Sequence, residues 1–180
     1  RITDWFIRNE VIPLEDKELY TYGLKQGALM VLNIGTTIII GIILKMVWQS
    51  ILLMIVYIPF RTYAGGYHAR TQFRCYILSV GIMSATLLAM KLIPWTNFIC
   101  LIVTLCGGSI IFLLAPVEDS NKPLDQKEIV LYRKKTRIIL SILLMVNLLF
   151  WILGQKQISI CITMAIVLLA VMLVLGKINR

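Results

Sequence analysis

The chain has 180 residues, of which 59% are hydrophobic and only 15% are charged, and its formal net charge is +9. A soluble domain carries about 25% charged residues, so this composition excludes an ordinary water-soluble protein and predicts a membrane protein. Nucleic-acid binding is not indicated, because no soluble segment carries a basic stripe interleaved with aromatic residues. Since apolar runs recur from residue 27 to the C-terminus, we expect one membrane-embedded domain over residues 1–180.

The segment before the first apolar run mixes hydrophobic and charged residues at helix-like intervals. Trp5 and Phe6 are examples, and Pro13 followed by Glu15 and Asp16 resembles a helix start. We therefore expect an N-terminal interfacial helix that anchors the first span. The first run is too long for a signal-peptide core, so we expect it to remain in the mature protein.

Six apolar runs are close to the length of a membrane-spanning helix. They cover residues 27–44, 47–60, 75–90, 95–116, 138–153 and 158–176. The sequence therefore predicts an all-α fold, a polytopic transmembrane helical bundle of about six spans. The second and third runs are short, at roughly 22 Å against a hydrocarbon core of ~30 Å, so the polar segment 61–74 is expected to dip below the membrane surface. An alternative of four spans with re-entrant hairpins keeps the same face inside.

The basic residues indicate which face is inside. With the N-terminus inside, six crossings leave only Lys45, Lys91 and Lys156 of the 18 basic residues off the cytoplasmic side. This asymmetry follows the positive-inside rule. It predicts that the N- and C-termini are both cytoplasmic.

The acidic residues limit the possible chemistry. All nine lie before the first span or in the loop after the fourth, and no predicted span carries a carboxylate. That distribution argues against a proton-coupled carrier with an intramembrane acid, an aspartyl intramembrane protease and a HExxH metallopeptidase.

The segment between the second and third runs holds the best candidates for catalysis. It contains His68, the only histidine, and Cys75, the one cysteine at the edge of a predicted span. The attacking form of cysteine is the thiolate, which is favoured by a neighbouring imidazole, by cations such as Arg70 and Arg74, and by a helix N-terminus. The other three cysteines lie inside apolar runs, where cysteine packs as a small hydrophobe, so no disulfide is expected.

The spacing of His68 and Cys75 sets a geometric condition. On one continuous helix seven residues rise about 10.5 Å, too far for a hydrogen bond, so a dyad requires a break between them. Gly65 and Gly66 permit a tight reversal, and a helix starting near Thr71 would complete the geometry. The residue types alone favour a catalytic dyad no more than the alternative, in which a juxtamembrane histidine and an interfacial cysteine share no role.

We expect no metal and no cofactor, because one histidine and one cysteine supply two of the four ligands that zinc usually takes.

Several motifs resemble those of a known family. Arg61, the run Ala-Gly-Gly-Tyr-His-Ala at 64–69, and Cys75 resemble the signature of the accessory gene regulator protein B (AgrB) family. The sequence Ala-Pro-Val-Glu at 115–118 and Asn-Lys-Pro-Leu at 121–124 resembles its loop after the fourth span, and Tyr-Thr-Tyr-Gly at 20–23 fits too. The resemblance covers nearly the whole chain.

The resemblance implies a membrane cysteine endopeptidase, a thiol protease of quorum sensing in the bacterial cell membrane. By this comparison His68 is the general base and Cys75 the nucleophile, supported by Arg61, Gly65 and Gly66. The implied substrate is a small AgrD-like precursor peptide with an acidic C-terminal tail. The enzyme would cut off the tail at the cytoplasmic face, and a thioester acyl-enzyme would then pass to a substrate cysteine and close a thiolactone ring. A homodimer is a further expectation from the resemblance.

The loop after the fourth span offers a candidate substrate-binding residue. Lys122 lies in the family-like motif and could hold the acidic tail, whereas the basic cluster at 133–137 fits a topology anchor better. Two other classes of function stay open. One is a peptide exporter that does not cut, and the other is a membrane scaffold, for which His68 and Cys75 would have no special role.

Overall fold

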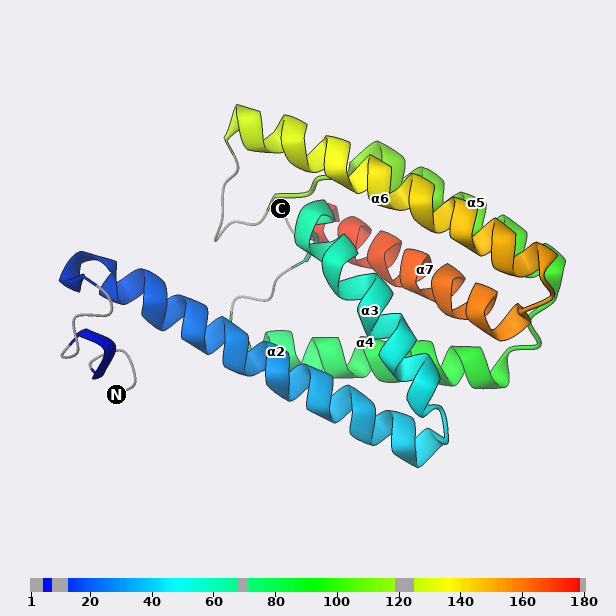
Figure 1. The fold of residues 1–180 in the computed structure, drawn as a ribbon, viewed down its shortest axis with the longest axis horizontal. Coiled ribbons are helices and arrows are strands. Elements are labelled where there is room, and N and C mark those ends of the chain that lie inside the picture. The colour runs from blue at the N-terminus through cyan, green and yellow to red at the C-terminus, as the bar shows by residue number, and fades with distance from the viewer. Residues whose placement is uncertain (1–4, 8–12, 68–70, 119–124, 179–180) are drawn as a thin grey trace.

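The computed structural model describes residues 5–7, 13–67, 71–118 and 125–178, and these form an all-α fold, as predicted (Figure 1). After a short 3-10 helix at Leu14–Asp16 come six long helices. They are α2 (Lys17–Leu44), α3 (Val47–Ala64), α4 (Gln72–Leu92), α5 (Asn97–Leu114), α6 (Gln126–Ile152) and α7 (Lys156–Ile178).

Five of these helices are long and apolar enough to cross a membrane: α2 over Gly23–Leu44, α4, α5, α6 and α7. The chain is therefore a multi-pass membrane protein. Helix α3 is not in this group. It has only 18 residues, and Arg61 and the other polar residues among them lower its mean hydropathy. The six crossings of the sequence analysis stay a prediction, with α3 as the helix that decides the number.

The polar segment between the second and third helices is shorter than expected. Helix α3 continues to Ala64 and α4 starts at Gln72, so residues 65–71 connect them and Arg61 lies on a helix. Helix α4 has 21 residues, which corresponds to about 32 Å, so the expectation of a short third span was wrong. The helix extends beyond its apolar run because the Thr71 side chain caps it, accepting a hydrogen bond from the Arg74 backbone N–H at 3.3 Å.

The start of α6 also differs from the prediction. Asp125 and Glu128 form a capping box. The Gln126 N–H donates a hydrogen bond to the Asp125 carboxylate at 2.7 Å, and the Asp125 N–H donates one to the Glu128 carboxylate at 3.1 Å. The helix therefore begins 12 residues before the predicted span at 138. The basic cluster at 133–137 lies on α6 and not in a loop.

Helix α7 forms the centre of the bundle and packs mainly against α3, α5 and α6. Helix α2 packs mainly against α3 and α4, and its first turns extend away from the other helices (Figure 1). At one depth in the bundle a buried polar cluster joins three helices. Asn147 on α6 donates to Thr104 on α5 (3.3 Å) and to Thr163 on α7 (3.2 Å), and accepts from Ser159 (2.6 Å). Such hydrogen bonds help to hold membrane helices together.

The helices alternate in direction, so their connections separate into two sets (Figure 1). The starts of α2, α4 and α6 and the ends of α3, α5 and α7 point to the same side of the bundle, and we call this side the loop end. Lys45, Lys91 and Lys156 lie at the opposite end, where the Lys91 ammonium donates to the Leu44 carbonyl at 3.1 Å. For the basic residues that the structure describes, the charge split found in the sequence is therefore also a split between the two ends of the bundle.

Candidate active site

Cys75 lies in the first turn of α4 at the loop end, and its side chain is half-buried. Its backbone N–H donates to the carbonyl of the capping residue Thr71 at 3.0 Å, which confirms the predicted helix start. The thiol is therefore near the positive end of the helix dipole. All four cysteines are free, but Cys100 and Cys161 are buried and Cys106 is exposed on the outer surface of α5.

A cavity of about 500 Å³ opens beside Cys75. Helices α2, α3 and α4 form its walls, α7 contributes Leu168 and Met172, and the loop after α5 contributes Pro116, Val117 and Glu118. Cys75 is the one cysteine among the lining residues. A reactive thiol here would be accessible to a substrate and still surrounded by protein.

The loop leading out of α3 is held at the mouth of this cavity. Gly65 has φ +75° and Gly66 has φ +124°, the positive values expected of this glycine pair. The start of α4 at Gln72 confirms that no continuous helix joins positions 68 and 75. The Gly66 N–H donates to the Val117 carbonyl (3.4 Å), the Val117 N–H donates to the Ala64 carbonyl (3.0 Å), and the Tyr67 N–H donates to the Met172 carbonyl (2.9 Å). The loop is thus fixed against both the segment after α5 and the last turns of α7.

Arg61 fastens the same loop from the side of α3. One guanidinium nitrogen donates to the Tyr57 hydroxyl at 3.0 Å, and another donates to the Tyr67 carbonyl at 2.7 Å. Arg61 also lines the cavity. Because Tyr67 directly precedes His68 in the chain, this contact fixes the backbone from which His68 continues.

The structure brings together four of the predicted site residues, Arg61, Gly65, Gly66 and Cys75, around one cavity. His68 and Lys122 lie outside the described residues, so the His68–Cys75 pair stays a prediction. Among the residues that the structure describes, no three His, Cys, Asp or Glu side chains lie close enough together to hold a metal ion.

Sequence reasoning missed three residues that hold the site. Tyr57 could have been found, since it lies four residues before Arg61 on the same helix and hence on the same face. Met172 acts through its backbone carbonyl and Val117 through its carbonyl and its N–H. A backbone contact between distant segments leaves no signal in residue type, although Val117 does lie in the family-like motif at 115–118.

Comparison with known proteins decides the family. The sequence profile described as "Accessory gene regulator B" matches residues 1–173. The chain belongs to the AgrB family. This confirms the resemblance seen in the motifs and places the chain among the membrane peptidases of quorum sensing.

Curated AgrB-like relatives are distant. AgrB-like protein 2 of Clostridium perfringens strain 13 is 25% identical in an alignment of length 143, which covers 75% of this chain and 67% of that protein. An AgrB-like protein of C. perfringens strain SM101 is 26% identical over 143 residues, with the same coverage. No solved structure is significantly similar to the chain.

The two glycines of the loop should tolerate no side chain. A Cβ on Gly66 would lie 3.1 Å from the Met172 carbonyl oxygen at a φ of +124°, and one on Gly65 would collide with the Val117 carbonyl. A non-glycine residue in such backbone costs about 1–3 kcal/mol. We expect Gly66→Ala to lower precursor processing at least about tenfold, measured by mass spectrometry of the cleaved tail.

Gly81→Ala on α4 is the matched control, because a Cβ there meets nothing within 4 Å. It should leave processing unchanged. Wild-type processing by Gly66→Ala would show that the loop geometry is unimportant for the reaction.

Proposed function

We propose that this protein is a cysteine endopeptidase of the bacterial cell membrane that removes the C-terminal tail of a small AgrD-like precursor peptide. The observation that carries the proposal is the position of Cys75, which opens into a cavity whose mouth is formed by the fixed loop leading to His68. Family membership supports the same activity. Exporters and scaffolds have no need of this arrangement.

The proposed reaction has two steps. His68 takes the proton from the Cys75 thiol, the sulfur attacks the scissile carbonyl, and the C–N bond breaks as the proton passes to the leaving amine of the tail. The N-terminal fragment is then a thioester on Cys75. A cysteine thiol within that fragment attacks the thioester carbonyl, which closes a thiolactone ring and returns Cys75 as a thiol.

The backbone N–H groups at the start of α4 favour the first step at this place. In the first turn of a helix the backbone N–H groups have no acceptor within the helix, and those of Gln72 and Phe73 precede Cys75. Such donors can stabilise the negative charge that develops on the attacked carbonyl oxygen.

Lys122 is our proposed contact for the acidic tail of the precursor.

The direct test uses the purified protein in lipid vesicles with a synthetic precursor. We expect two products: the free tail with a new amino terminus, and an N-terminal fragment lighter than its linear acid by one water. Recovery of the precursor uncut, under conditions in which the protein remains folded, would overturn the proposed function.

We further propose that the loop end faces the cytoplasm, with both termini there, the N-terminal segment at the interface, and α3 as the sixth crossing. The support is the charge split, because Lys45, Lys91 and Lys156 are the only ones at the other end among the basic residues that the structure describes. An active site at the loop end would then meet a newly made precursor.

Sidedness can be tested with single cysteines at Lys127, near the start of α6, and at Lys156, at the start of α7. In a background without native cysteines, a membrane-impermeant maleimide should label position 156 in intact cells, and position 127 only after permeabilisation. Labelling of position 127 from outside would reverse the orientation.

A further inference from the structure

The cavity beside Cys75 changes in character from its mouth to its floor. Residues at the mouth are mainly polar and come from the loop end of each element: Gln26, Arg61, Thr62, Glu118 and Tyr132. The floor is formed deeper in the bundle by Met54, Met83 and Leu168. On α4, Cys75, Ser79 and Met83 follow one another at four-residue spacing, so the floor lies roughly 12 Å below the thiol.

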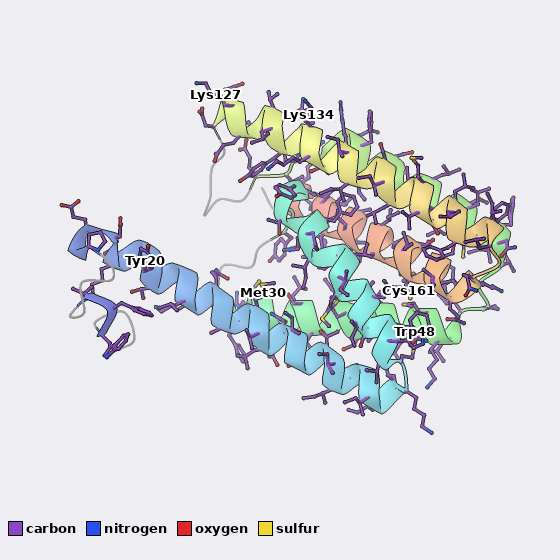
Figure 2. All side chains as sticks on the ribbon, viewed as in Figure 1. Tyr20, Met30, Trp48, Lys127, Lys134 and Cys161 are labelled. Atoms are coloured by element: carbon purple, nitrogen blue, oxygen red, sulfur yellow. The ribbon has the colours of Figure 1, made fainter. Side chains whose placement is uncertain are left out.

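Methionine is the commonest apolar residue that lines the cavity, ahead of isoleucine and leucine. Met30, Met54, Met83 and Met172 line the cavity, and each comes from a different helix; Met30 on α2 is labelled in Figure 2. Together they are half of the eight methionines in the chain. Methionine is unbranched, flexible and polarizable, so it forms apolar surfaces that adapt to more than one bound group.

The polar groups of α2 on the inner wall do not call for a polar ligand. The Thr37 hydroxyl donates to the Asn33 carbonyl at 2.7 Å, and the Asn33 amide donates to the Leu29 carbonyl at 3.0 Å. These donors are therefore satisfied within α2. Among the lining residues, every charged side chain lies at the mouth. A charged group entering the floor would lose its hydration without gaining an ionic partner there.

We infer that the apolar part of the cavity between Cys75 and this floor is a specificity pocket for a bulky apolar side chain of the precursor, on the acyl side of the scissile bond. The inference rests on the proposed peptidase function. The acyl fragment stays joined to Cys75 until the ring closes, whereas the tail leaves. An apolar residue held in the cavity would also keep water away from the thioester.

The pocket can be probed first without the precursor, using alkyl methanethiosulfonates from methyl to hexyl. Each forms a mixed disulfide with a cysteine thiolate and releases methanesulfinate. A cysteine introduced at Lys127, exposed near the start of α6, corrects for loss of the longer reagents into detergent. We expect the ratio of the Cys75 rate to the rate at position 127 to rise at least about tenfold from methyl to hexyl.

A variant that fills the cavity should remove this dependence. Ser79 lines the cavity one turn below Cys75, so Ser79→Leu should make the ratio independent of chain length. Ser84→Leu is the matched control, because Ser84 is also half-buried on α4 but does not line the cavity. A flat ratio in the wild-type protein would overturn the pocket, whatever the variants do.

The second arm uses precursors with Ala, Leu, Phe or Asp immediately before the cut. We expect wild-type kcat/KM to be at least about tenfold higher for Leu and Phe than for Ala, and lowest for Asp. Ser79→Leu should bring the Phe-to-Ala ratio close to one, and Ser84→Leu should keep it.

Equal cleavage of all four precursors by the wild-type protein would overturn the inference and leave the peptidase function intact. Cleavage of none, with the chain-length dependence present, would instead refute the proposed function. A lipid acyl chain as the natural occupant would give the chain-length dependence with no preference among the precursors, and this also overturns the inference.

Discussion

Cys75→Ala and His68→Ala are each expected to abolish cleavage of a co-expressed precursor, lowering its rate by about 10³-fold or more. The first substitution removes the nucleophile, and the second removes the group that takes its proton. A nucleophile and its base act as one unit, so catalytic activity is almost completely lost when either residue is removed. Mass spectrometry of the precursor and its released tail measures the effect.

The control is the joint replacement of Cys100, Cys106 and Cys161 by alanine. None of the three lines the cavity beside Cys75, so processing should persist in this variant. Full processing by Cys75→Ala would instead refute the peptidase assignment, and loss in the triple variant alone would move the nucleophile to another cysteine.

Arg61→Lys is expected to lower processing by about 10²-fold, although the positive charge is kept. The guanidinium joins the Tyr57 hydroxyl to the Tyr67 carbonyl, and a lysine ammonium lacks the fork that spans both. Hydrogen bonds from charged groups contribute about 1.5–3 kcal/mol, and the loop that they hold continues into His68. Tyr57→Phe removes one of the two bonds, so we expect a smaller loss of about fivefold.

A second readout separates positioning of His68 from general damage to the fold. The pH dependence of Cys75 alkylation reports whether an imidazole assists the thiol, and a cysteine introduced at Lys127, exposed near the start of α6, serves as the reference. We expect the Arg61→Lys profile to resemble that of His68→Ala. A profile like that of the wild-type protein, together with a wild-type processing rate, would show that Arg61 does not position the loop.

Local features of the site could be read from the sequence because local chemistry decides them. The backbone break at Gly65 and Gly66 and the helix start at Thr71 depend on residue type alone. The charge split follows from the alternation of apolar runs and predicts which connections share an end of the bundle. Hydropathy located the apolar part of each of the six long helices for the same reason.

Helix ends and long-range contacts could not be read in this way. An apolar run stops where polar residues begin, but a helix continues through them to a capping residue, as at Thr71 and Asp125. The carbonyls of Val117 and Met172 meet the loop only after α5 and α7 have packed. The convergence of methionines from four helices on one cavity likewise depends on the tertiary arrangement.

The most direct test of the central claim is to look for the acyl-enzyme itself. A precursor whose ring-forming cysteine is replaced should still be cut at Cys75, but its N-terminal fragment should remain attached to the enzyme. Intact-mass measurement should show an increase equal to that fragment, removable by hydroxylamine and absent from Cys75→Ala and His68→Ala. Rapid release of a linear acid with no adduct on the wild-type enzyme would contradict a thioester protected from water and held for ring closure.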